Sequence, residues 1–137
     1  MKRADVIVVA ALAATLFCSG CSDALTVSGA RLTSATALMQ GKRSPVSSFH
    51  PDDRIVMLVD LTWADPTDEA GWHLCQWKWY REGVLVSQSP VERINFRRTP
   101  VTLRSARPAA PLGLGHFRVE TTVDDVVIAT SQFDIAA

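Results

Sequence analysis

The clearest feature of the chain is the β-like pattern of two segments in its middle part, in which one of the two alternating faces is apolar and the other carries the polar residues. Residues 54–63 read RIVMLVDLTW, and residues 72–81 read WHLCQWKWYR. A period of two is typical of β-strands that bury one face. The faces that we expect to point into a core are Ile55, Met57, Val59, Leu61 and Trp63 in the first segment and His73, Cys75, Trp77 and Trp79 in the second.

Turn residues divide the remainder of the chain into further short strands. Glu82-Gly83, after the second segment, and Asp124-Asp125, between two apolar runs, each predict a hairpin. Residues 32–40 (LTSATALMQ) fit either a short helix or a first strand followed by a loop. The additional strands are expected at residues 84–86, 92–97, 101–105, 116–123 and 126–135.

About seven short strands at close intervals predict an all-β fold, an antiparallel sandwich, with a barrel as the alternative. The pattern resembles immunoglobulin-like periplasmic domains in three places: residues 49–53 (FHPDD) before a strand, residues 79–83 (WYREG) at the end of a Trp-bearing strand, and a closing pair at residues 115–119 and 133–135. The resemblance implies an immunoglobulin-like β-sandwich over residues 30–137. It lacks the Cys…Trp…Cys spacing of antibody domains, because Cys75 is the only cysteine in this region.

The N-terminus carries a different signal. Lys2 and Arg3 precede the run VIVVAALAATLF at residues 6–17, which is too short for the roughly 20 residues of a membrane-spanning helix. A positive start and a short apolar run are typical of a secretory signal peptide. The next residues, 18–21 (CSGC), resemble the lipobox of bacterial lipoproteins, in which small residues precede a cysteine that receives a diacylglycerol. The resemblance implies a signal peptide at residues 1–20 and lipidation of Cys21.

The processed chain would therefore start at Cys21, with residues 21–29 as the lipidated N-terminus and a tether. In enterobacterial lipoproteins, Asp after the cysteine retains the protein in the inner membrane. By this resemblance, Ser22 implies an anchor in the outer membrane that faces the periplasm, with surface display as the alternative. The 14 basic and 14 acidic residues of the full chain balance. An exported protein without a positive excess is not expected to bind nucleic acid.

The residue types of catalytic and metal sites are present, but not in catalytic or ligating patterns. Cys75 lies on the face that we assign to the core, so we expect a buried thiol. The alternative is a disulfide with another chain. His50, His73 and His116 are too far apart in sequence to predict a metal site. The acidic pairs Asp52-Asp53, Asp68-Glu69 and Asp124-Asp125 fall in expected turns, where Asp caps backbone N–H groups. We expect no catalytic residues, no metal and no cofactor.

Two clusters remain as candidate binding features. Of four tryptophans, Trp63, Trp72, Trp77 and Trp79, we expect Trp72 to be the exposed one, since it lies on the opposite face from Trp77 and Trp79. A basic stretch of 15 residues without Asp or Glu contains five arginines, which we assign to partner binding: Arg93, Arg97, Arg98, Arg104 and Arg107. Arg forms forked contacts with carboxylates and phosphates. A solvated strand edge is the alternative.

These features predict a lipid-anchored lipoprotein of the cell envelope that works as a non-catalytic binding or assembly module in the periplasm. Its partners would be the membrane, through Cys21, and a protein or another envelope component. The alternatives are a surface-displayed adhesin or inhibitor domain and a hydrolase of cell-wall material. For the hydrolase the sequence offers no pair of nucleophile and base.

Lipidation can be tested by labelling cells that express the full chain with a palmitate analogue. We expect the wild-type protein to carry the label and the Cys21→Ser variant to lack it, because the thiol is the acceptor. Cys18→Ser is the matched control and should keep the label. A Cys21→Ser protein with unchanged label and unchanged mature size would show that the acceptor is wrongly assigned.

Overall fold

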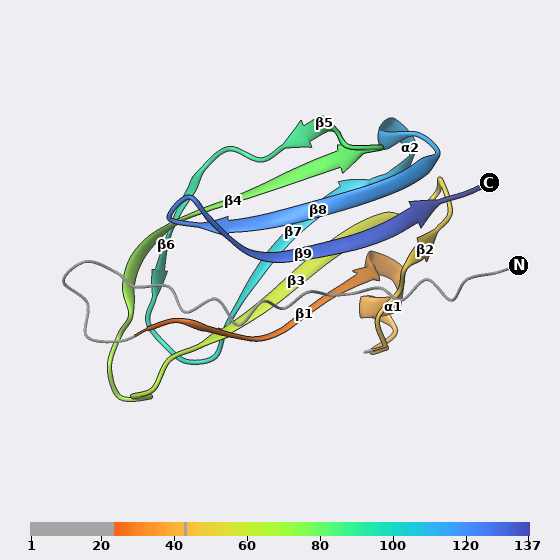
Figure 1. Ribbon diagram of the computed structural model, residues 1–137. Coiled ribbons are helices and arrows are strands. Elements are labelled where there is room, and N and C mark those ends of the chain that lie inside the picture. The colour runs from red at the N-terminus through yellow and green to blue at the C-terminus, as the bar shows by residue number, and fades with distance from the viewer. Residues whose placement is uncertain (1–23, 43) are drawn as a thin grey trace, which may run out of the picture.

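Two β-sheets lie face to face in the computed structural model, which describes residues 24–42 and 44–137 (Figure 1). A three-stranded sheet has the order β1-β3-β7, and a six-stranded sheet has the order β2-β9-β8-β4-β5, with β6 also paired to β4. All pairings are antiparallel except that of β2 with β9. The elements are β1 (Thr26–Ser34), α1 (Ala35–Met39), β2 (Ser48–Phe49), β3 (Arg54–Thr62), β4 (Gly71–Arg81), β5 (Val84–Gln88), β6 (Glu92–Phe96), β7 (Val101–Pro108), α2 (Ala109–Leu112), β8 (Gly115–Val123) and β9 (Val126–Ile135). The antiparallel sandwich is confirmed, with nine strands in place of about seven.

The core lies between the sheets and contains the faces that the alternation assigned to it. The four expected core residues of β3, Trp63 directly after it, and the four expected core residues of β4 are all buried. Aromatic rings fill the middle of the core. The ring of Phe133 in β9 lies 5.1 Å from that of Phe117, 5.6 Å from that of Phe49 and 5.9 Å from that of Trp79. Such edge and stacked contacts add to the stabilisation that comes from burying large side chains.

The first strand starts earlier than the expected tether allows. β1 begins at Thr26, and Leu25 and Val27 are buried, so residues 26–29 belong to the sheet. The small, mostly uncharged residues of this segment indicated a tether, but the burial of two apolar side chains stabilises the segment as part of the sheet. Residues 32–40 contain both of the expected alternatives. The strand ends at Ser34, whose hydroxyl accepts a hydrogen bond of 3.0 Å from the Ala37 amide and so caps the short helix α1.

One edge of β4 pairs with β8, and its second edge is shared by two short strands. β6 pairs with its first half, from Gly71 to Cys75, and β5 with its last part, from Lys78 to Arg81. Ser89 bridges the gap between them. Its amide donates to the carbonyl of Trp77 (2.9 Å), and its hydroxyl accepts from the amide of the same residue (3.0 Å). Because a buried backbone group without a partner is costly, Ser89 keeps β4 satisfied where the edge changes strands.

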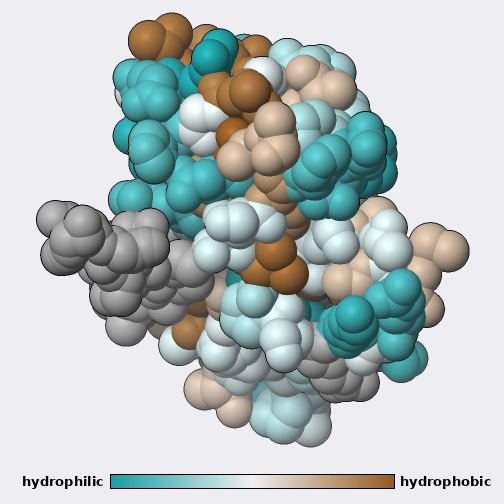
Figure 2. Space-filling view, turned by 90° about the vertical axis from the view of Figure 1, so that its right-hand side faces the viewer, coloured by the Kyte–Doolittle hydropathy of each residue, from teal (hydrophilic) through white to brown (hydrophobic). Residues whose placement is uncertain are grey.

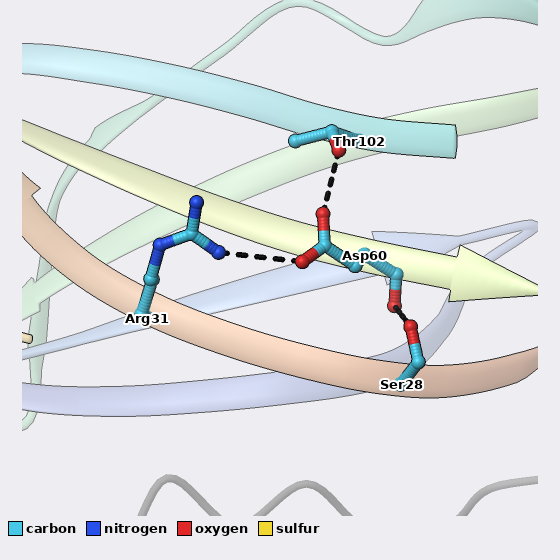
Figure 3. A network of polar contacts seen from close by, with 4 residues as sticks. All are labelled: Ser28, Arg31, Asp60 and Thr102. Atoms are coloured by element: carbon cyan, nitrogen blue, oxygen red, sulfur yellow. Dashed lines mark hydrogen bonds and ion pairs between the residues drawn. The ribbon is translucent and has the colours of Figure 1, made fainter. Parts of the chain in front are cut away.

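On the outer face of the three-stranded sheet, Asp60 of the central strand joins all three strands (Figure 3). Its carboxylate accepts a hydrogen bond of 2.6 Å from the Thr102 hydroxyl in β7 and pairs with the Arg31 guanidinium in β1 at 3.3 Å. Its backbone carbonyl accepts from the Ser28 hydroxyl at 3.3 Å. The polar residue that interrupts the apolar pattern of β3 therefore has a structural role.

Replacing Asp60 should therefore loosen both neighbours of β3. We expect Asp60→Ala to lower the free energy of unfolding by about 1–2 kcal/mol, since a half-buried network loses one charged acceptor and two donors lose their partner. Asp60→Asn is the control, because it keeps an acceptor for Thr102 and should cost less. Urea unfolding measures both, and equal stability of wild type and Asp60→Ala would contradict the assigned role.

Candidate interaction surfaces

The five arginines of the basic stretch do not form one patch. Arg93, in β6, lies on the outer face of the six-stranded sheet, since it is paired in register with the exposed Leu74. Arg97 and Arg98 are exposed in the loop after β6, which ends at Phe96, one residue before the expected strand end. Arg104 is exposed on the outer side of the other sheet. The chain crosses from one sheet to the other between β6 and β7, and this crossing separates residues that are neighbours in sequence.

Arg107 points inward and joins the two sheets at their open edge. Its Nε donates to the Ser87 hydroxyl in β5 at 2.9 Å, and one terminal nitrogen donates to its neighbour's carbonyl, that of Ala106, at 2.8 Å. Its guanidinium lies 5.9 Å from the centre of the Trp79 ring. These contacts already engage the guanidinium, so the structure gives Arg107 a role in holding the sandwich together.

Cys75 is buried, as the alternation predicted, and its surroundings make it unreactive. Burial raises the pKa of its thiol to about 12, and the negative charges of Asp124 and Glu92 add to the effect. Since the thiolate is the nucleophile and the metal ligand, a neutral thiol without solvent access is chemically inert.

His73 beside it is buried and has two acceptors. Its Nδ1 lies 2.6 Å from a carboxylate oxygen of Asp124, and its Nε2 lies 2.8 Å from the carbonyl of Ala70. The ring also stacks on Phe96 at 4.6 Å. Asp124 in turn accepts from the Leu74 amide at 2.9 Å. The histidine therefore fastens the β8–β9 turn and the loop before β4 to each other, and both of its nitrogens are occupied by protein atoms.

His50 and the acidic pairs lie in turns and loops, and His116 lies near the start of β8. His50 donates its amide to Asp53 at 2.8 Å, and Asp124 and Asp125 form the β8–β9 turn with positive φ angles of 51° and 66°. Within the part of the chain that the structure describes, no group of three or more His, Cys, Asp or Glu side chains is placed to hold a metal ion. No helix among these residues is long and apolar enough to cross a membrane.

A shallow hollow of about 190 Å³ lies beside the β4–β5 turn. Its lining contains His116, whose Nδ1 contacts Asp134 and whose amide donates to the Glu82 carboxylate at 3.0 Å. The residues that line it are Glu82, Gly83, His116, Phe117, Arg118 and Gln132. This set contains one histidine and one carboxylate, both in contact with other protein groups, and no hydroxyl or thiol side chain.

Strand β5 is the most apolar exposed element. Its first three residues, Val84, Leu85 and Val86, are exposed by 65%, 45% and 43%. Among the described residues, β5 pairs only with β4, so its other edge is free. Figure 1 places β5 and α2 at the top of the molecule, and Figure 2 shows hydrophobic residues gathered at the top of its view. The sequence carried a signal for this surface: three consecutive apolar residues in a strand cannot all face one core.

A second exposed group lies on the outer face of the six-stranded sheet, near the start of β4. Trp72 is exposed by 53%, as expected, and the Arg93 guanidinium covers its ring at 4.3 Å. Leu74, two residues further along the same face, is also exposed. This arrangement combines an aromatic ring, an aliphatic side chain and a positive charge in one place.

Comparisons with known proteins assign the fold. No protein-family model and no curated protein matches the chain. An immunoglobulin-like protein from Pseudomonas aeruginosa superposes with a TM-score of 0.52 over 82% of this chain and 96% of its own, at 13% sequence identity. The alkylpurine DNA glycosylase AlkC of Pseudomonas fluorescens, bound to DNA containing an abasic site analog, matches 82% of this chain with a TM-score of 0.58 and 10% identity. The match spans 30% of the glycosylase chain. At these identities the likeness shows the fold alone, which is an immunoglobulin-like β-sandwich.

The inert state of Cys75 can be tested with a water-soluble maleimide. We expect slow labelling of the folded domain at neutral pH and fast labelling in denaturant, because unfolding restores both solvent access and an ordinary thiol pKa. A Cys75→Ser variant supplies the background. Labelling of the folded protein at the rate of a free thiol would contradict the burial.

Proposed function

We propose that this protein is a lipid-anchored lipoprotein of the cell envelope, held at the outer membrane through Cys21 and facing the periplasm, where it works as a non-catalytic binding or assembly module. The lipobox-like residues before Cys21 support the anchor, although they lie outside the described residues. The immunoglobulin-like sandwich supports a binding module, and the free, apolar edge of β5 is the observation that carries the proposal.

The binding surface that we propose is the edge of β5, with an extended segment of a partner protein as the occupant. A free edge presents unpaired N–H and C=O groups, to which a partner strand can add by main-chain hydrogen bonds. Val84, Leu85 and Val86 add apolar side chains, whose burial stabilises association by about 25 cal/mol per Å² of area.

Two other edge strands, β6 and β7, are protected in ways that β5 is not. β6 carries Glu92 and Arg93 and lies between prolines at positions 90 and 100. β7 carries Arg104 and Arg107 and ends at a proline. Charges and prolines at an edge discourage pairing with another chain. β5 has no charged residue, and its one irregularity is a bulge at Val86, which lies between the residues paired with Trp79 and Tyr80.

Site-specific photo-cross-linking in cells tests the surface. We expect a crosslinker at Leu85 to give a discrete higher-mass adduct, and one at the equally exposed Val126 of β9 to give none. Leu85→Lys, combined with a crosslinker at Val84, should abolish the adduct and leave the Tm within about 2 °C of wild type, because an exposed substitution costs under about 0.5 kcal/mol. Equal adducts at Leu85 and Val126, or none at β5, would contradict the proposal.

A further inference from the structure

We infer that the end of the sandwich that carries Trp72, Arg93 and the Arg97-Arg98 loop rests on the phospholipid headgroups, so that the domain has a fixed orientation on the membrane. The inference rests on the proposed anchor at Cys21. The inference goes beyond the proposed anchor by naming the surface that meets the lipid and the surface that faces away from it.

The first step is the length of chain between the anchor and the folded domain. Only residues 22–24 separate Cys21 from Leu25, which is buried in the core. Four residue steps span at most roughly 14 Å when fully extended, at 3.3–3.6 Å per residue. A lipid-linked Cys21 therefore keeps Leu25 within about 14 Å of the headgroup layer, which is less than half the length of a β-sandwich strand such as β4.

The second step identifies the end from which the anchor leaves. The start of β1 is paired with the end of β3, as Thr26 lies opposite Thr62. The end of β3 is in turn paired with the start of β7, as Leu61 lies opposite Val101. Two strand spacings, or about 10 Å, therefore separate the start of β1 from the β6–β7 loop. Figure 1 shows the start of β1, the β3–β4 connection and the β6–β7 connection at one end, and α1, α2 and the C-terminus at the other.

The third step is the chemistry that this end presents to the lipid. Trp72 is the second residue of β4, and its half-exposed ring is covered by Arg93. Arg97 and Arg98 project from the loop beyond β6. Trp side chains favour the boundary between lipid and water, and guanidinium groups bind phosphate.

Acidic residues at the same end limit the electrostatic attraction. The β3–β4 loop contains Asp65, Asp68 and Glu69. Hydrogen bonds from the Thr67 hydroxyl and amide lower the pKa of Asp65 and so keep it ionised. The β8–β9 turn lies at the same end and adds Asp124 and Asp125, so carboxylates outnumber the three arginines there. It follows that the short tether provides the docking, that zwitterionic lipid is sufficient for it, and that the domain without its lipid does not bind vesicles.

The protein contains its own probe of this orientation. Trp63, Trp77 and Trp79 are buried, so Trp72 is the one exposed tryptophan of the four. Lipidated protein is purified from membranes, its intact mass is checked for the lipid, and it is reconstituted in phosphatidylcholine vesicles that contain a lipid with a spin label on its headgroup. We expect the label to quench Trp72, and Trp72→Phe to remove the quenched component.

Two variants make the test specific. Inserting about 20 Gly and Ser residues after Ser22 adds a mean reach of about 25 Å and should abolish most of the quenching. Val84→Trp in the Trp72→Phe background places the probe on β5, at the other end, and should show no quenching. Lipidated protein with unquenched Trp72, or with the Val84→Trp probe quenched as strongly as Trp72, overturns the orientation and leaves the anchor intact. A mass without lipid overturns the anchor, and the orientation with it.

Discussion

Burial of the inward face of β4 is the constraint on which the rest of the structure depends. Trp77 and Trp79 are large, and both are fully buried. Two indoles can be removed from water only when a second sheet lies about 10 Å across from them. The ring of Trp79 accordingly meets Phe133 from its own sheet and Arg107 from the opposite one. β4 is an interior strand of its sheet, and it pairs with β8 on one side and with β5 and β6 on the other.

The division of the second edge of β4 produces two surfaces of different chemistry. β4 has 11 residues, whereas β5 and β6 have five each, so neither covers the edge alone. Ser89 closes the gap by satisfying both backbone groups of Trp77. As a result β6, with its charged residues, lies at the end from which β1 starts, and the apolar β5 lies at the far end. One packing requirement thus separates the two candidate interaction surfaces along a single strand.

The alternation of side chains explains which expectations the structure confirms. The inner faces of β3 and β4 must be apolar, and the period of two in β4 correctly assigned Cys75 and Trp79 to the core and Trp72 to the surface. In β3 the period is incomplete, because Val56 and Leu58 on the opposite face are buried as well. The two-residue strand β2 has no room for a pattern, and its parallel pairing with β9 depends on residues more than 80 positions away. Strands of this kind are stabilised by tertiary contacts that single-sequence periodicity does not contain.

The arginines of the basic stretch do not lie together on one surface for a related reason, because sequence distance approximates spatial distance only within one element. Arg104 and Arg107 lie three residues apart, so they already face opposite sides of β7, and the crossing between sheets removes Arg93 to another layer. Strand order would have been needed to foresee this, and strand order follows from the packing of β4 and not from the local sequence.

The two proposed surfaces have a geometric relation that bears on how a partner would be met. β5 lies beside Lys78 to Arg81, seven or more residues from the start of β4 at Gly71. At about 3.3 Å per residue, this places the β5 edge roughly 23–33 Å from the end that we propose faces the lipid. With the proposed anchor at Cys21, a tether of three residues would prevent free tumbling and keep the β5 edge at a defined height above the membrane. For a partner attached to the same membrane, restricted orientation lowers the entropic cost of association, and confinement raises the effective concentration. A short five-residue edge could then support an interaction that would be too weak between two freely diffusing proteins.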